Sequence, residues 1–201
     1  MRLFLAITLP DHVRAAITRA VAPARAAAPH VRWVREESLH LTLRFLGERP
    51  ATDVALLGES VQRALAPVAG FTATIRDAGA FPNFRRPRAV WLGMHPRDTF
   101  GALVRRLEAT LAALGIAVEN RPFRPHVTLG RVGAPLAAAE GEALARALRA
   151  IRQRWTMDVH EVVLMRSTLG PGGSTYTPVA AAQLAGAAGA STAAQASAGG
   201  R

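Results

Sequence analysis

Two short stretches of the sequence hold residue types that can carry acid–base chemistry, and both follow one pattern. His40–Gly47 reads HLTLRFLG and His126–Gly133 reads HVTLGRVG, so the first, third, fourth and eighth letters are identical and the second is aliphatic in both. An internal repeat predicts related structural units. Each unit here supplies one imidazole and one hydroxyl.

Two imidazoles and two hydroxyls suit the cleavage of a phosphodiester. A base must take a proton from the attacking oxygen and an acid must give one to the leaving oxygen, and imidazoles with a pKa near 6.5 can hold opposite protonation states at neutral pH. Threonine hydroxyls can donate hydrogen bonds to non-bridging phosphate oxygens, where negative charge builds up. This chemistry requires neither a metal nor an organic cofactor, and we expect neither. A zinc site is a competing interpretation, but threonine is a poor zinc ligand and the chain has no cysteine.

The motifs alternate as strands do. Successive side chains of a strand point to opposite faces, which places His40 and Thr42 on one face and Leu41 on the other. The second motif divides in the same way. If the two halves pack about an approximate two-fold axis, both imidazoles and both hydroxyls could meet in one cleft.

Further elements are predicted around the motifs from hydrophobic periodicity. Apolar residues at helical spacing predict four helices, for two of which Thr52 or Asp53 and Asp98 are candidate N-caps. Alternating or continuously apolar runs predict strands. The expected helices cover residues 10 to about 23–29, 52–68, 98–114 and 135–151, and the expected strands cover 1–9, 31–34, 71–75, 89–94, 155–167 and 176–179.

The segment 79–88 (GAFPNFRRPR) is predicted to be a loop and combines three arginines with two phenylalanines. That composition can neutralise phosphate and stack on a base. An ordinary surface turn with buried aromatic side chains is the competing interpretation, and the sequence favours it slightly.

Length and composition bound the class of protein. A chain of 201 residues, half of them hydrophobic, can bury the core of one domain or of two closely packed lobes. The formal net charge is +11, and all 25 cationic side chains are arginine, with no lysine. This composition fits a basic RNA-binding patch and a general excess of arginine equally well. The apolar start is interrupted by Pro10-Asp11-His12 and no apolar run reaches membrane-spanning length, so we expect a cytoplasmic protein.

The motifs and several further segments resemble the two-histidine phosphoesterase superfamily. Within it they are most similar to the bacterial and archaeal RNA 2',3'-cyclic phosphodiesterases, historically called 2'-5' RNA ligases. The resemblance covers residues 1–180. It rests on Arg2–Phe4, Arg32–Val34, Leu39–Gly47, Gly79–Pro82, Trp91–Gly93, Arg124–Leu129, Ser167 and Tyr176.

This resemblance implies an α+β fold with two lobes, in which two pseudo-symmetric, antiparallel-rich sheets flank a central cleft and helices lie on the outside. Residues 1–180 would form this single bilobal catalytic domain, with the motifs at 40–47 and 126–133. The segment 181–201, rich in Ala, Gly and Ser, has little to bury and is expected to be a disordered tail.

The resemblance also implies hydrolysis of a terminal 2',3'-cyclic phosphate on RNA to a 2'-phosphomonoester. His40 would be the proton donor to the leaving 3' oxygen, and His126 would be the proton acceptor that activates water. Thr42 and Thr128 would bind the phosphate.

A cationic contact to the phosphate has two candidates. The family pattern points to Arg131, whereas strict alternation places Arg44 on the face of its histidine. A bend or bulge at the end of the strand would reconcile the two, and we favour Arg131.

The expected partners are RNA ends or small cyclic-phosphate nucleotides, with no membrane, and the expected oligomeric state is a monomer. Two alternatives stay open. The substrate could be a 2'-5' linkage or another small cyclic phosphate, including ligation as the reverse reaction. From a different class, the protein could be a non-catalytic RNA-binding module.

Overall fold

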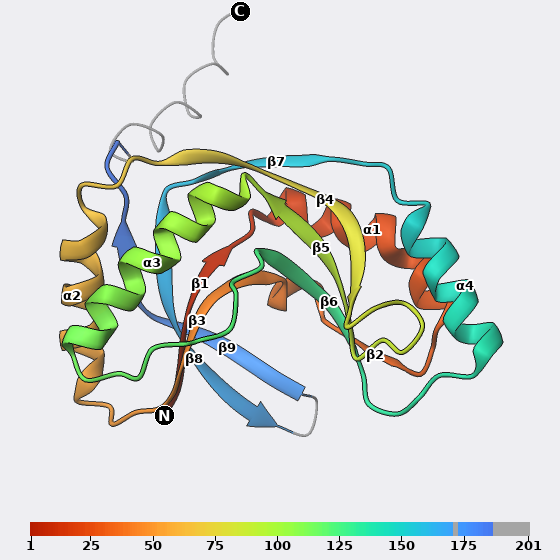
Figure 1. The fold of residues 1–201 in the computed structure, drawn as a ribbon, viewed down its shortest axis with the longest axis horizontal. Helices are drawn as coiled ribbons and strands as arrows, with labels where there is room; N and C mark the ends of the chain where they lie inside the picture. Colours follow the sequence, from red (N-terminus) through yellow and green to blue (C-terminus); the bar gives the residue numbers. More distant parts are fainter. Residues whose placement is uncertain (171–172, 187–201) are drawn as a thin grey trace, which may run out of the picture.

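The computed structural model describes residues 1–170 and 173–186 and combines helices with a large sheet (Figure 1). The helices are α1 (Asp11–Ala27), α2 (Asp53–Leu65), α3 (Arg97–Ala113) and α4 (Ala138–Arg149), with a short 3-10 turn at Glu36–Ser38. The strands are β1 (Arg2–Thr8), β2 (Val31–Trp33), β3 (His40–Glu48), β4 (Phe71–Phe81), β5 (Ala89–His95), β6 (His126–Val132), β7 (Trp155–Val159), β8 (Glu161–Gly170) and β9 (Gly173–Gln183).

The strands form one curled antiparallel sheet in the order β7-β4-β5-β6-β3-β1-β8-β9, with β2 paired to β6. The two motif strands, β3 and β6, are neighbours in its middle and are joined by the single residue pair Leu41 and Val127. The two predicted sheets are therefore the two halves of this sheet, one containing β3 and the other β6. The predicted α+β fold with antiparallel-rich halves is confirmed.

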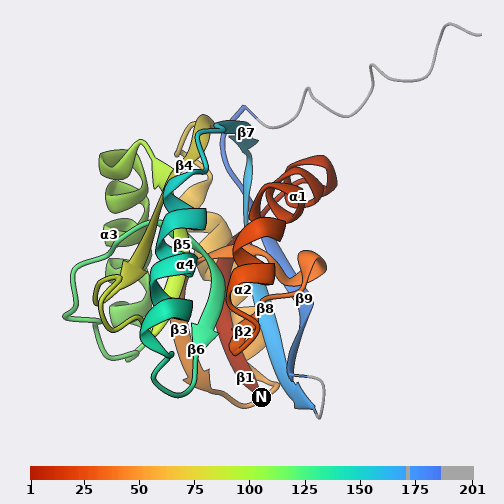
Figure 2. The same cartoon turned by 90° about the vertical axis from the view of Figure 1, so that its right-hand side faces the viewer.

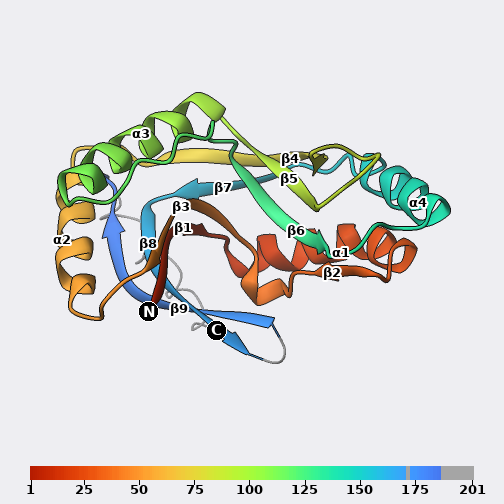
Figure 3. The ribbon, with the colours of Figure 1, turned by 60° about the horizontal axis from the view of Figure 1, so that its bottom comes forward.

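The helices repeat the two-fold relation of the motif strands. Helices α1 and α3 each lead toward a motif strand, and α2 and α4 each follow one. Figures 1 and 2 show that α1 packs beside α4 at one end of the molecule, and Figure 1 shows α2 beside α3 at the other end. The ends of β8 and β9 near Gly170 and Gly173 extend away from these helices (Figure 3), whereas the other end of β9 packs against α2.

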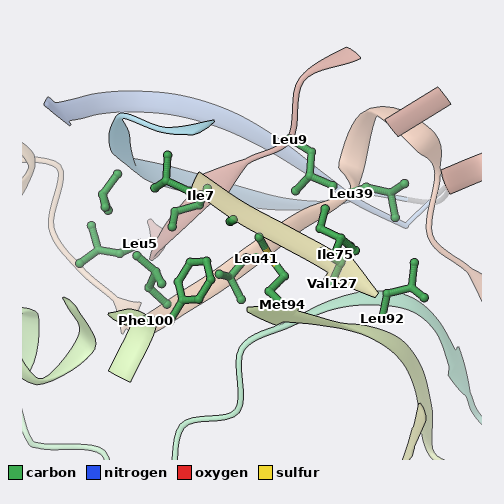
Figure 4. Close-up of a cluster of buried hydrophobic side chains, with 14 of the residues drawn as sticks. Leu5, Ile7, Leu9, Leu39, Leu41, Ile75, Leu92, Met94, Phe100 and Val127 are labelled. Atoms are coloured by element: carbon green, nitrogen blue, oxygen red, sulfur yellow. The ribbon is translucent and has the colours of Figure 1, made fainter. Parts of the chain in front are cut away.

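The core lies between the helices and the apolar face of the sheet (Figure 4). Leu41 and Val127 are fully buried there, together with Ile17 of α1 and Phe100 of α3. Burying each such side chain contributes about 1.5–3 kcal/mol relative to leaving it exposed. The apolar half of each motif therefore fixes which face its polar half presents.

Several predicted boundaries differ from the structure. The expected strand 155–167 is two strands that separate at His160, because β7 pairs with β4 in one half and β8 pairs with β1 in the other. Strand β4 runs to Phe81, so the first three residues of the expected loop 79–88 are strand. The predicted capping by Thr52 or Asp53 and by Asp98 is wrong. Asp53 and Asp98 lie inside their helices, and neither helix start has a side-chain cap hydrogen bond within the described residues.

The ordered fold continues past residue 180. Strand β9 reaches Gln183, Leu184 is buried, and the carbonyl of Ala185 accepts a hydrogen bond from the amide of Gly70. Residues 181–186 therefore belong to the fold and not to the predicted tail. The rest of that tail, 187–201, lies outside the described residues. Within the described residues, no helix has the length and apolar character needed to cross a membrane.

Candidate active site

The pairing of β3 with β6 brings the polar residues of the two motifs to one face of the sheet. Leu41 lies opposite Val127, and both point into the core. Residues next to an antiparallel pair point to the other face, and opposed side chains have Cβ atoms about 4.5–5.5 Å apart. Continuing this register places His40 across from Thr128. By the same register, Thr42 lies across from His126.

A cleft of about 400 Å³ opens on this face. Its lining includes His40, Thr42, Thr128 and Arg131, which come from both motif strands. His126 does not line this hollow directly, but it is close enough that its charge lowers the pKa of His40. Four of the six candidate residues therefore line this cleft, and His126 lies near His40 without lining it.

The imidazole of His40 is held on every side. Its Nδ1 lies 2.7 Å from the carbonyl oxygen of Ser38, and because a carbonyl only accepts, Nδ1 carries the hydrogen. Its Nε2 lies 3.0 Å from Oγ1 of Thr42. The rings of Phe4 and Tyr176 pack against it with centroid separations of 5.1 and 4.9 Å. The atom that can exchange a proton with a ligand is therefore Nε2.

His126 is held in the same manner by different neighbours. Its Nδ1 donates to the carbonyl oxygen of Arg124 at 2.6 Å, again two residues before the histidine. Phe81 contacts the ring edge-to-face at 5.0 Å, and Trp91 lies 6.1 Å away, centroid to centroid. Both motifs thus leave Nε2 as the reactive nitrogen.

The acidic pair before the first motif does not orient its histidine. Of Glu36 and Glu37, the second pairs with Arg35 at 3.0 Å, and the carbonyl of Ser38 holds the ring of His40.

The surroundings lower the pKa of both imidazoles below 6.5. Burial is the largest cause for each ring, and the positive charge of Arg131 adds to it. The carbonyl hydrogen bonds to Nδ1 act in the opposite direction and are outweighed. Both rings are therefore mainly neutral at pH 7 in the free protein, and an anion in the cleft would favour protonation.

A bulge in each motif strand settles which arginine faces the cleft. Opposite β1, β3 has two extra residues, Leu43 just before Arg44 and Leu46 after Phe45. Opposite β5, Leu129 is an extra residue in β6. An extra residue reverses the alternation that follows it. Arg131 consequently lines the cleft, as the predicted bulge requires.

Arg44 is turned away from the cleft by its own bulge. Its Nε lies 2.5 Å from Oε1 of Glu108 on α3, and its guanidinium also donates to the carbonyl of Ala117. The two side chains of this ion pair are only 11% and 14% exposed. The structure therefore places Arg44 in the packing of β3 against the α3 region, apart from the other candidate residues.

Sequence reasoning missed Phe45. The bulge in β3 brings this residue to the cleft, where the residue is 53% exposed and its ring lies 5.8 Å from that of Phe4, centroid to centroid. Phe45 and Arg131 each occupy the sixth position of a motif, so the two halves present an aromatic ring and a cation at equivalent places. Comparing the motifs at that position was the signal that could have identified it.

Among the described residues, no three His, Cys, Asp or Glu side chains gather in a way that could hold a metal ion. The competing zinc interpretation therefore finds no ligand set in that part of the chain.

Comparison with known proteins gives a consistent result. The family model described as "2'-5' RNA ligase superfamily" matches residues 9–171. A protein of Methanothermobacter thermautotrophicus named RNA 2',3'-cyclic phosphodiesterase is 35% identical over 88% of this chain and 95% of its own length. Among solved structures, TT0787 of Thermus thermophilus has a TM-score of 0.74 at 31% identity, covering 92% of this chain and 98% of its own. Escherichia coli LigT complexed with 3'-AMP has a TM-score of 0.71 at 34% identity, covering 91% and 97%.

Proposed function

Because this chain belongs to the 2'-5' RNA ligase superfamily, we propose that it is an RNA 2',3'-cyclic phosphodiesterase. It hydrolyses the terminal 2',3'-cyclic phosphate of an RNA to a 2'-phosphomonoester. The observation that carries the proposal is the register of β3 with β6, which sets a His-x-Thr unit from each half of the chain on one face, beside one cleft.

The two imidazoles divide the proton transfers between them. His126 takes a proton from water through Nε2 as the water oxygen bonds to phosphorus. His40 gives its Nε2 proton to the 3' oxygen as the bond from phosphorus to that oxygen breaks. Each transfer contributes about 10²–10⁴ in rate. Afterwards His40 is neutral and His126 is protonated, and exchange with solvent restores both.

The bond between His40 and Thr42 couples protonation to phosphate binding. While His40 is neutral, the Thr42 hydroxyl donates to Nε2 across the observed 3.0 Å. Once His40 is protonated, Nε2 becomes a donor, and the hydroxyl hydrogen of Thr42 is free to bond a phosphate oxygen. Thr128 offers a second hydroxyl from the opposite strand.

Arg131 neutralises the phosphate and tunes both histidines. Its charge lowers the pKa of each ring in the free protein. A bound phosphodiester anion offsets that charge, so protonation of His40 becomes easier when substrate arrives. His40 therefore gains the proton that it donates mainly after the substrate has bound.

The test is incubation of the purified protein with an RNA that ends in a 2',3'-cyclic phosphate, in the presence of EDTA. Phosphorus NMR of the product should report a 2'-phosphomonoester. Absence of conversion, or conversion only after addition of a divalent metal, would contradict the proposal. Joining of RNA ends through a 2'-5' linkage would favour the ligase alternative, and binding of the cyclic end without cleavage would favour the RNA-binding module.

A further inference from the structure

A second and larger hollow, of about 1250 Å³, lies between α4, the end of β6 and the turn formed by residues 82–88. Figures 1 and 3 show this turn, between β4 and β5, facing α4. Arg85, Arg86 and Arg88 of the turn line the hollow together with Arg149 of α4. The lining contains one carboxylate, Glu142. This groove is therefore strongly positive.

The turn that carries these arginines is ordered by its own side chains. Oδ1 of Asn83 accepts hydrogen bonds from the amides of Arg85 and Arg86 at 2.9 and 3.2 Å. The guanidinium of Arg149 lies 4.8 Å from the centroid of the Phe84 ring, which packs against the core. Asn83 thus holds the backbone of the turn that carries three of the arginines, and the guanidinium of Arg149 is held against Phe84.

The arginines of the turn are exposed and have no acidic partner within residues 1–170 and 173–186. Arg85, Arg86 and Arg88 form no ion pair there, and their guanidinium groups take part in no hydrogen bond to those residues. Three neighbouring cations without counter-charges attract a polyanion.

The groove and the active-site cleft share no lining residue but come near each other at the end of β6. Arg131 lines the cleft, and Val132, the next residue, lines the groove and donates a hydrogen bond to the carbonyl of Arg88. On β4, which β5 separates from β6 in the sheet, Phe81 packs against His126, and the residue after it lines the groove. A chain that leaves the cleft along these strand ends enters the groove.

We propose that this groove binds the backbone phosphates on the 5' side of the cyclic end, which makes the substrate a polynucleotide and not a free cyclic mononucleotide. The inference rests on the proposed function and specifies its substrate. A cleft of about 400 Å³ has the size of a site for one small ligand. The nucleotides that precede the terminal one must lie outside it, and the groove supplies the cations that their phosphates need.

The experiment compares two substrates, a 2',3'-cyclic mononucleotide and a cyclic-ended oligonucleotide of about ten residues. In the triple variant Arg85→Ala, Arg86→Ala, Arg88→Ala, the KM for the oligonucleotide should rise about tenfold, and the dependence of log KM on log salt should weaken by about 2. Turnover of the mononucleotide should stay as in the wild type. A matched control, Arg19→Ala, Arg105→Ala, Arg152→Ala, removes the same charge from exposed positions outside both hollows and should leave both substrates unaffected.

A second variant keeps every arginine. A Cβ at Gly141 meets no atom within 4 Å, so Gly141→Glu adds a carboxylate to the groove without a clash, and glutamate is the better helix former. It should raise the KM for the oligonucleotide alone. If the wild type handles both substrates equally, or if both variants keep the wild-type preference, the groove does not bind RNA and fits an acidic protein instead. Absence of turnover of both substrates by the wild type would refute the proposed function separately.

Discussion

Gly79→Ala tests whether the packing around His126 governs catalysis. Gly79 lies opposite Trp91 in the β4–β5 pair, and a Cβ built on Gly79 would stand 2.2 Å from Cζ2 of the Trp91 ring. The same ring lies 5.0 Å from Phe81, and both aromatic residues pack against His126. The new methyl group therefore displaces the aromatic rings that hold His126, the proposed base, and it contacts no residue that lines the cleft.

The size of the effect follows from the clash. An ordinary contact of about 3.4 Å requires the indole or the β4 backbone to move by about 1 Å. A misplacement of about 1 Å at a catalytic group can cost about 10²-fold in rate. Overpacking of this kind also destabilises a protein by about 1–3 kcal/mol. We expect kcat to fall about a hundredfold while KM changes little, because the phosphate-binding side chains keep their places.

The assay measures kcat, KM and thermal unfolding for Gly79→Ala beside Gly141→Ala, where the added methyl group meets nothing within 4 Å. The control should keep its activity and gain about 0.5–1 kcal/mol. The double variant Gly79→Ala, Trp91→Phe should recover much of the lost rate, because phenylalanine lacks the indole atoms that clash. Trp91→Phe also removes a buried Nε1 that has no hydrogen-bond partner among residues 1–170 and 173–186. A Gly79→Ala variant with wild-type kcat, or a double variant no faster than the single one, would refute the reasoning.

The remaining predictions concern the catalytic groups and the cleft. His40→Ala and His126→Ala should each lower kcat by about 10²–10⁴ and leave thermal unfolding close to the wild type, and a variant that stays active removes its histidine from the mechanism. Because the pKa of each ring lies below 6.5, kcat/KM plotted against pH should peak below 6.5, with its alkaline limb from loss of the His40 proton and its acid limb from protonation of His126. Arg131→Gln should raise the pKa of both rings, move the pH profile to higher pH and lower kcat/KM by about 10²–10³. Arg44→Gln should leave the pH profile unchanged. In a denaturant titration, it should lower the free energy of unfolding by about 3 kcal/mol. Phe45→Ala should raise KM for a cyclic nucleotide by about tenfold, since base stacking contributes about 1–3 kcal/mol, and an unchanged KM would exclude a stacking role.

The convergence of the motifs could be predicted because it follows from two features of the sequence itself. Alternation in HLTL and HVTL fixes which side chains share a face, and the repeat predicts that the halves are related. Nothing in the letters marks Leu43 and Leu129 as the extra residues of a bulge, because a bulge depends on the partner strand. For that reason, the sequence analysis did not identify Phe45 as a cleft residue, and it could favour Arg131 only through the family resemblance.

The end of the fold could not be predicted from composition. Residues 181–183 fall in the predicted tail because that segment is rich in alanine, yet tertiary contacts hold them in the fold. The side chain of Gln62 on α2 accepts a hydrogen bond from the amide of Gln183 at 2.8 Å and donates one to its carbonyl at 3.2 Å. A partner so distant in the sequence leaves no local signal, and it overrides the low strand propensity of alanine.

A crystal structure with orthovanadate bound in the cleft tests the central claim most directly, because vanadate adopts the geometry of a phosphoryl group under attack. The account predicts one vanadate ion with Nε2 of His40 and Nε2 of His126 each within about 3 Å of a different vanadate oxygen. A vanadate that contacts only one of the two rings, or that binds elsewhere and leaves the cleft empty, would contradict it.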